Sequence, residues 1–300
     1  MEKARLYILA GFLGSGKTTL LRQLLQQADP QLRIAVCENE FGEVGLDGLQ
    51  LRDDRFELLE LNAGCICCTL GPALVMGIKT LCARFHPHII LMEPTGLAGL
   101  ADVRALLEDP GLQKIIDVRS AVAVVSGRAF AHDMPRFERY YGDLIASASC
   151  ISLNRTDDMT QEQREELLGM IVQRNFAAPV LEELQDGAQL WAAMDSATLP
   201  PAGEPQPRNW LSTFQEVAVS TGWAGSRGRV EDFFAGSQLC GDILRAKGFA
   251  QDEEGHWWQG DYAGGELCWE RAGSATSPWL QIIGRNLAIK KIKSFFAEHE

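Results

Sequence analysis

The sequence predicts an α/β fold: a mostly parallel sheet with helices on both faces, followed by a smaller α+β domain. In the first two thirds of the chain, apolar runs of strand length alternate with segments of helical spacing. After that the pattern changes to short alternating segments, and six of the seven tryptophans lie there. The strands of the large sheet are expected at residues 6–10, 33–37, 56–61, 88–92, 119–126, 149–153 and 179–181.

A proline-rich stretch marks the domain boundary. Four prolines fall within residues 199–208, which predicts a stiff, extended linker. We therefore expect a first domain at residues 1–199, a linker at 200–208 and a second domain at 209–300. In the second domain we expect a helix that starts at Arg229 and continues toward residues 239–244. The other expected elements are strands at 214–219, 246–249, 256–259, 266–269 and 279–284, and a final helix at 287–296.

The composition narrows the class of protein. Three hundred residues with 46% hydrophobic side chains can bury two cores. The net charge of −12 argues against nucleic acid as a partner. The apolar runs are too short to span a membrane, and the first one is too short for a secretory signal. Eight cysteines without an export signal favour a reducing compartment, so we expect a cytoplasmic protein.

A glycine-rich loop predicts a phosphate site. Residues 11–18 read Gly-Phe-Leu-Gly-Ser-Gly-Lys-Thr and lie between an apolar strand and a helix. Its glycines let backbone N–H groups converge at a helix N-terminus, where a polyphosphate is stabilised. Lys17 would neutralise the terminal phosphates and the Thr18 hydroxyl would ligate Mg²⁺. The alternative is a strand–helix turn that is glycine-rich by chance. It would not explain why Lys17 and Thr18 follow the glycines at the spacing that a phosphate site requires. The expected nucleotide ligands here are Gly11, Gly14, Ser15, Gly16, Lys17, Thr18 and Thr19.

Carboxylates follow two of the predicted strands. Residues 38–47 contain four acidic side chains and two glycines, a composition typical of a loop beside the phosphate site. Glu93 ends another strand and is followed by Pro94, Thr95 and Gly96. We expect Asp47 and Glu93 to complete the Mg²⁺ shell or to position the attacking water, and the Gly96 N–H to approach a γ-phosphate. The alternative for residues 38–47 is a solvated acidic loop.

Three cysteines within four residues, Cys65, Cys67 and Cys68, predict a metal site. Thiolates are soft ligands that select zinc, copper(I) or similar ions. A closed zinc site needs four ligands, and adjacent cysteines are poorly placed to chelate one tetrahedral ion together. The cluster is therefore expected to supply two thiolates, with Glu38 and Glu43 as candidates for the remaining ligands. A thiol redox switch and buried inert cysteines are the alternatives.

A turn after the strand at 149–153 predicts base recognition. Asn154-Arg155-Thr156-Asp157 matches the Asn-Lys-x-Asp pattern that reads guanine in GTP-binding proteins, in which the Asp accepts from two base donors and the Asn braces the loop. Arg155 stands in the position of the Lys, and its guanidinium can also stack on a base. Alone, these four residues would be an ordinary turn. After a strand, and downstream of a phosphate loop, they favour GTP.

The order and spacing of these motifs resemble those of the CobW-type GTPases, metal-handling relatives of the hydrogenase and urease nickel-insertion GTPases. Residues 245–248 and 283–287 resemble the C-terminal domain of that family. The resemblance implies a GTP-binding and GTP-hydrolysing metallochaperone that uses GTP, Mg²⁺ and Zn²⁺ (or Co²⁺). It also implies delivery of the metal to a client metalloprotein through the C-terminal domain. The five histidines are scattered, so there is no histidine-rich tract of the kind many members carry.

Two functions from other classes stay open at this point. One is a small-molecule kinase or ATPase that uses the same phosphate loop, and base preference separates it from a GTPase. The other is a nucleotide-gated thiol redox sensor. The number of metal ions bound per chain under reducing conditions would distinguish it from a metal-binding GTPase. The motifs contain neither a catalytic glutamine nor an arginine finger, so slow hydrolysis is expected. The oligomeric state is left undetermined.

Overall fold

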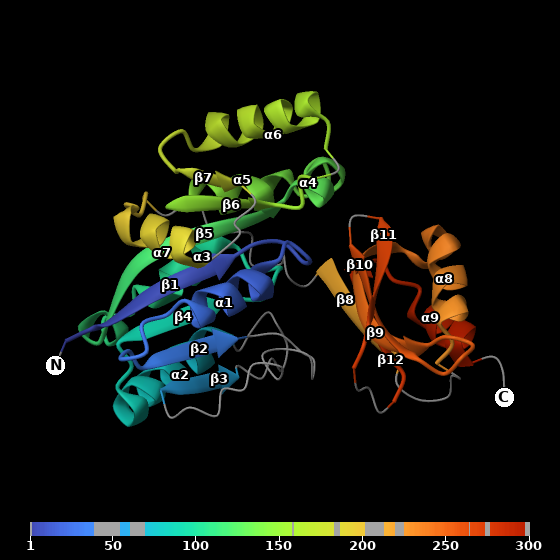
Figure 1. The fold of residues 1–300 in the computed structure, drawn as a ribbon, viewed down its shortest axis with the longest axis horizontal. Helices are drawn as coiled ribbons and strands as arrows, with labels where there is room; N and C mark the ends of the chain where they lie inside the picture. The colour runs from blue at the N-terminus through green and yellow to red at the C-terminus, as the bar shows by residue number, and fades with distance from the viewer. Residues whose placement is uncertain are drawn as a thin grey trace. The chain divides into compact units, whose positions relative to one another are not determined.

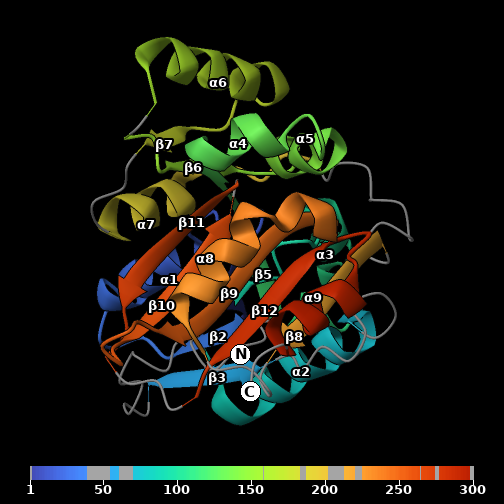
Figure 2. The same cartoon turned by 90° about the vertical axis from the view of Figure 1, so that its right-hand side faces the viewer.

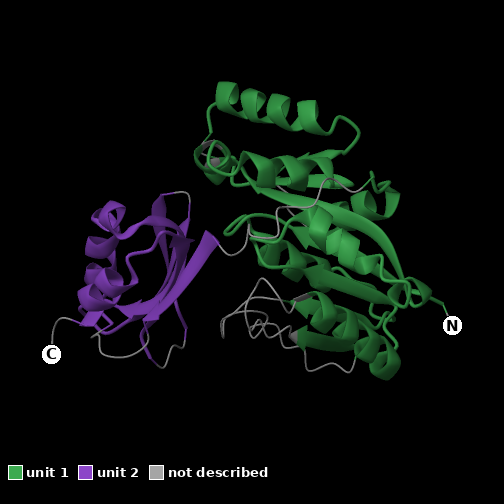
Figure 3. Ribbon diagram, turned by 180° about the vertical axis from the view of Figure 1, so that it is seen from behind, with its two compact units in different colours: residues 1–208 green, residues 209–300 purple. Residues whose placement is uncertain are grey.

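The computed structural model describes residues 2–38, 55–60, 70–157, 159–182, 187–201, 213–219, 225–263, 265–273 and 277–297. The chain divides into two compact units, residues 1–208 and residues 209–300 (Figure 3). Within the described residues, no helix is both long enough and apolar enough to cross a membrane.

The first unit is built on a seven-stranded sheet in which every paired neighbour is parallel (Figure 1). The strand order is β3-β2-β4-β1-β5-β6-β7. This arrangement confirms the predicted parallel α/β fold. The strands are β1 (Ala4–Ala10), β2 (Ile34–Glu38), β3 (Phe56–Glu60), β4 (Ile89–Glu93), β5 (Ile116–Ser126), β6 (Cys150–Asn154) and β7 (Val180–Glu182).

Helices cover both faces of this sheet. On one face, α1 (Lys17–Gln26) and α7 (Gly187–Ser196) pack over a core that includes Tyr7, Leu21 and Leu190. Figure 2 shows α2, α3 and α5 on the other side of the sheet. The remaining helices of the unit are α2 (Leu70–Phe85), α3 (Leu100–Leu107), a 3₁₀ turn at Leu112–Lys114, α4 (Gly127–Asp133), α5 (Glu138–Ala146) and α6 (Gln161–Arg174).

The central strands are recognisable in the sequence because both of their faces are buried. Every residue of β4 is buried, and four of its five residues are apolar. The strand ends at Glu93, where the sheet meets the candidate site. Helix α2 is absent from the predicted elements. Its buried positions, Leu74, Ile78 and Leu81, nevertheless follow helical spacing.

The second unit contains a five-stranded antiparallel sheet in the order β11-β10-β9-β12-β8. Helices α8 and α9 share one hydrophobic core with it, to which Phe233, Ile282 and Phe296 contribute. The predicted α+β character is confirmed. The elements are β8 (Phe214–Val219), α8 (Arg227–Ala235), a 3₁₀ turn at Ser237–Cys240, β9 (Asp242–Gln251), β10 (Trp257–Ala263), β11 (Glu266–Arg271), β12 (Trp279–Arg285) and α9 (Ile289–Ala297).

One predicted helix is too long. The helix expected to continue from Arg229 toward residues 239–244 ends at Ala235, and residues from Asp242 onward form β9. Gly236 caps α8, and Gly241 has a φ of 109°, a left-handed conformation that side chains rarely adopt. The apolar residues after Gly241 therefore belong to the sheet.

Candidate nucleotide-binding site

The phosphate loop connects β1 to α1 and depends on its glycines. Gly14 and Gly16 have φ values of 78° and 99°, which only glycine adopts without strain. A Cβ on Gly11 would lie 2.3 Å from the Val124 carbonyl oxygen of the neighbouring strand. Gly16 is also the N-cap of α1 and has no side chain to cover the first N–H groups. Those N–H groups and the helix dipole form a site suited to an anion.

Two side chains at the end of the loop, Lys17 and Thr18, make polar contacts with neighbouring segments. Lys17 is 3% exposed, and its Nζ donates to the Phe12 carbonyl oxygen at 3.4 Å, across the loop. The Thr18 Oγ1 donates to Glu93 Oε1 at 3.0 Å. The structure thus brings together two of the three residues that the sequence predicts for Mg²⁺, and the third, Asp47, lies outside the described residues. A hydroxyl and a carboxylate are the oxygen donors that Mg²⁺ prefers, so these residues fit the ion.

Glu38 and Glu93 end adjacent strands. They are register partners in the β2–β4 pair, and both are buried, with exposures of 6% and 1%. Adjacent strands lie about 4.8 Å apart, and register partners point to the same face of the sheet. Two buried carboxyl groups therefore lie on one face of the sheet at the ends of adjacent strands, and carboxylate oxygens are ligands that divalent cations accept. The structure places a predicted metal ligand, Glu38, beside the predicted Mg²⁺ ligand Glu93.

Cys37 precedes Glu38 on β2 but does not extend the metal-ligand set. Burial, with a smaller contribution from Cys82, raises the pKa of the Cys37 thiol to about 12. The thiol therefore stays protonated near neutral pH, and a protonated thiol is a poor metal ligand. Of the two neighbouring residues, only Glu38 is suited to bind a cation.

Gly96, which follows β4, packs against the phosphate loop at Leu13. A Cβ there would be 2.8 Å from both the backbone N and Cδ2 of Leu13. The backbone after β4 is therefore in direct contact with the backbone of the loop. This contact is consistent with the predicted position of the Gly96 N–H near the phosphates.

The predicted base-recognition turn is joined to the phosphate loop by a hydrogen bond. Asn154 ends β6, and its Nδ2 donates to the Ser15 carbonyl oxygen at 3.2 Å. Thr156 is buried, whereas Arg155 and Asp157 are exposed. Arg155 has a φ of 55°, an uncommon left-handed conformation for a residue with a side chain. The turn thus presents its two exposed charged side chains next to the phosphate loop.

Two supporting contacts were not predicted from the sequence. The Ser152 hydroxyl donates to Asn154 Oδ1 at 3.0 Å and fixes the amide that reaches Ser15. Phe12, at the start of the loop, packs against Phe137 and Tyr140, with ring centroids 4.9 and 5.3 Å away. The i, i+2 spacing of Ser152 and Asn154 on one strand was a usable signal. The aromatic contacts join residues far apart in the sequence, and no sequence pattern indicated them.

The rest of the predicted site lies outside the described residues. This applies to the three clustered cysteines and to two of the acidic residues: Cys65, Cys67, Cys68, Glu43 and Asp47. Their roles stay predictions. Thr19 lies within α1 as the sequence predicts, one residue after Thr18.

Together, the parallel sheet, the glycine-rich loop and the Thr18–Glu93 pair define a P-loop nucleotide-binding protein. The family model "CobW/HypB/UreG, nucleotide-binding domain" matches residues 5–182, more than half of the chain. The chain belongs to this family, and the predicted CobW-type resemblance is confirmed.

Similar proteins have names that refer to zinc. The chain is 37% identical over 163 residues to the zinc chaperone YeiR of Escherichia coli, covering 54% of this chain and 50% of YeiR. It is 31% identical over 194 residues to the zinc chaperone CobW of Pseudomonas aeruginosa, covering 54% and 51%. The chain thus spans about half the length of these curated relatives. A crystal structure of Zn(II)-bound YjiA GTPase from E. coli matches with a TM-score of 0.50 and 20% identity, covering 99% of both chains, and supports the fold.

Proposed function

We propose that this protein is a GTP-hydrolysing metallochaperone that binds Zn²⁺, or a similar ion such as Co²⁺, and passes it to a client metalloprotein. The pairing of Glu38 with Glu93 carries the proposal. It places a candidate ligand of the cargo ion on the strand next to the one that contacts the nucleotide loop. The names of the zinc chaperones YeiR and CobW support the same function.

Each part of the nucleotide would meet a different segment. The amides of the loop and Lys17 bind the phosphates. Thr18 and Glu93 would hold Mg²⁺, with Asp47 as a further candidate, and the bound ion would neutralise phosphate charge. Asp157 accepts from the two donors of guanine, while Asn154 holds the turn against the loop. Hydrolysis is expected to be slow without an external activating residue.

The cargo ion would bind at the thiolates of Cys65, Cys67 and Cys68, with Glu38 and Glu43 as oxygen ligands. The segment that contains Glu43 and Asp47 would connect the two sites, because it follows Glu38 in the sequence and includes a predicted Mg²⁺ ligand. A segment of this kind can be ordered by a γ-phosphate and released on hydrolysis. The second unit, residues 209–300, is the proposed docking domain for the client. A reducing compartment such as the cytoplasm would keep the thiols available.

The test is a zinc competition titration with GDP and then with a non-hydrolysable GTP analogue. We expect tighter zinc binding in the GTP form. By linkage, zinc must then strengthen GTP binding by the same factor, typically about 5- to 150-fold. Glu43→Ala and Glu38→Gln should reduce this factor while GDP binding is retained.

Glu182→Gln is the matched control, because Glu182 ends β7 of the same sheet but lies at its far edge. Its effect on the coupling should be negligible. Identical zinc affinities in the GDP and GTP forms would rule out a nucleotide-driven chaperone. Equal affinity for GTP and ATP would instead favour the kinase or ATPase alternative.

A further inference from the structure

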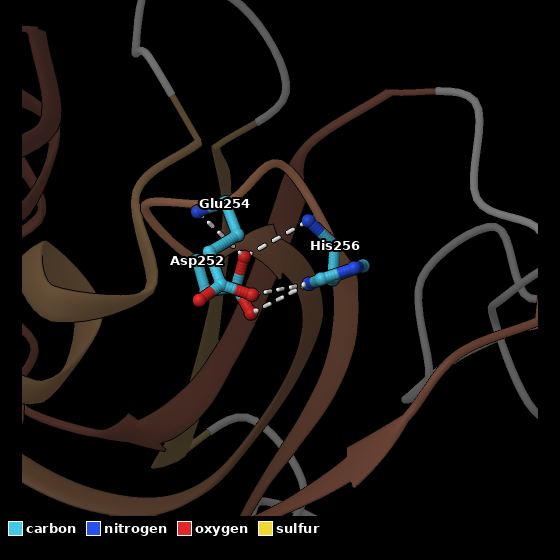
Figure 4. A group of neighbouring side chains, drawn as sticks. All are labelled: Asp252, Glu254 and His256. Carbon is cyan, nitrogen blue, oxygen red and sulfur yellow. Dashed lines mark hydrogen bonds and ion pairs between the residues drawn. The ribbon is translucent and has the colours of Figure 1, made fainter.

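The hairpin loop between β9 and β10 contains three side chains of metal-ligating type. Asp252, Glu254 and His256 converge at its tip, as Figure 4 shows. One ligand atom from each residue lies within 4.8 Å of the other two. The His256 Nδ1 is 3.4 Å from Asp252 Oδ2 and 3.4 Å from Glu254 Oε2. One imidazole therefore faces two carboxylates from its own loop.

These separations suit shared coordination better than direct hydrogen bonding. A charge-assisted N–H···O bond has a length of about 2.7–2.9 Å, well below 3.4 Å. Zinc binds nitrogen and oxygen ligands at about 2.0–2.2 Å, so two ligands at a tetrahedral angle lie about 3.3–3.6 Å apart. Both measured distances match this tetrahedral edge. A small cation could therefore bridge His256 to either carboxylate, and the two carboxylates, whose ligand atoms lie within 4.8 Å of each other, could close onto the same ion.

Asp252 is held in position by two backbone N–H groups of its own loop and by one side chain outside the triad, Trp258. Its Oδ1 accepts the backbone N–H groups of Glu254 and His256, at 3.0 and 2.9 Å. Its Oδ2 accepts from the Trp258 Nε1 at 2.9 Å and retains a second lone pair. The hydrogen bond from Trp258 is the main reason that the pKa of Asp252 is lowered to about 2. Ligand carboxylates that are oriented by second hydrogen bonds are typical of metal sites.

The exposure of the loop limits how tightly it could hold an ion. The His256 side chain is 43% exposed and that of Glu254 is 80% exposed. Arg271 lines the same open surface hollow as His256 and opposes a positive charge. With three protein ligands, at least one coordination position is left for water or for a group from another molecule. Such a site would exchange its ion readily.

We propose that Asp252, Glu254 and His256 form a second, low-affinity site for Zn²⁺ or a similar borderline divalent ion. The imidazole ligand favours such ions over Mg²⁺ and Ca²⁺, which take oxygen ligands. The binding itself is independent of the proposed chaperone function. Its role as an exchange point for cargo in the second unit rests on that function.

The experiment uses the full chain with the cysteine cluster removed, as the Cys65→Ala/Cys67→Ala/Cys68→Ala variant. Zinc is titrated in competition with a weak chromophoric chelator, without nucleotide. We expect one weak site to remain, and His256→Gln should lower its affinity at least tenfold. Trp258→Phe removes the indole N–H that orients Asp252, and it also replaces the ring that packs against Arg227 by a smaller one. Its effect should fall in the range of about 10- to 100-fold that is typical of outer-shell contacts.

His132→Gln is the matched control. The His132 side chain is 44% exposed, close to the value for His256, but among the described residues its Nδ1 forms an ion pair with one carboxylate, that of Asp133. This variant should bind zinc as the parent does. The proposal is overturned if His256→Gln and His132→Gln behave alike, or if the parent lacking the cluster binds no zinc.

Zinc titrations with GDP and with the GTP analogue distinguish a failure of the second-site proposal from a failure of the chaperone proposal. The His256→Gln substitution in the otherwise unaltered chain should leave the GDP and GTP-analogue zinc titrations unchanged, because the tight site is intact. Loss of GTP–zinc coupling with the hairpin site retained would refute the chaperone function alone. Coupling retained with no hairpin site would refute the second site alone.

Discussion

Gly96→Ala tests whether the backbone after β4 positions the phosphate loop. The added Cβ would lie 2.8 Å from the backbone N of Leu13 and 3.0 Å from its Cα. Real Cβ atoms essentially never lie closer than 3.0 Å to another heavy atom, and backbone atoms cannot turn away as a flexible side chain can. Gly96 is not among the residues with positive φ, so the effect is purely steric. Either the phosphate loop or the Gly96 segment must shift.

The cost follows from this overlap. Overpacking by one methyl group in a well-packed region costs about 1–3 kcal/mol. In one case, the loop shifts in the free protein to relieve the overlap. Nucleotide binding must then return the loop to its original position against the added methyl group. The affinity for GDP should then fall by roughly 5- to 150-fold, the factor that corresponds to this energy. If the loop does not move, the first unit is strained and its melting temperature falls by about 2–12 °C.

The assay pairs a GDP titration, followed by a fluorescent nucleotide analogue, with thermal unfolding. Gly142→Ala is the matched control, since Gly142 lies within α5 and nothing is within 4 Å of a Cβ there. That variant should be more stable by about 0.5–1 kcal/mol, with unchanged GDP affinity. If Gly96→Ala matched the wild type in both measurements, the contact with Leu13 would have no role in shaping the site.

Three further predictions concern the base, the cargo ion and the buried thiols. GTP should bind at least tenfold tighter than ATP, a difference of about 1.4 kcal/mol, and Asp157→Asn should remove most of that preference in a competition titration. Under reducing conditions the protein should bind about one Zn²⁺ tightly, and equilibrium dialysis should show this ion lost in Cys67→Ala but kept in Cys268→Ala. Iodoacetamide at pH 8 should label the exposed Cys268 in the native protein, whereas Cys37 and Cys150 should react only after unfolding. Burial raises the pKa of these two thiols to about 12 and about 11, so the reactive thiolate is scarce until the pH approaches those values.

The parts of the fold that were predictable are the ones with local signals. Strands β1 and β4 are short apolar runs between polar breaks, and the phosphate loop is contiguous in the sequence. Helix α8 was overextended because its apolar positions continue past Gly236 into β9. A hydrophobic pattern alone does not show where a chain changes from helix to strand. The two glycines near the boundary were the better signal.

The contacts that shape the site were not predictable, because they depend on strand order. No pattern in the sequence places β2 beside β4, although this neighbour pair brings Glu38 next to Glu93. The same holds for the Asn154–Ser15 hydrogen bond, which joins residues separated by 139 positions. The sequence identified the individual groups. Their distances follow from the parallel sheet.

The burial of the thiols bears on how zinc would be shared between the two proposed metal sites. Burial raises the pKa of Cys37, Cys82 and Cys150 and leaves them poor ligands, so thiolate binding in the first unit falls to the cysteines at 65–68. The hairpin site offers only oxygen and imidazole ligands and is largely exposed. At equilibrium, zinc would therefore stay bound to the thiolates at 65–68 unless their affinity for zinc were lowered. Hydrolysis of GTP, acting through the segment after Glu38, is the proposed source of that weakening. An exchange site outside the first unit would be useful only if this coupling exists, and for this reason the two titrations need to be made on the same variants.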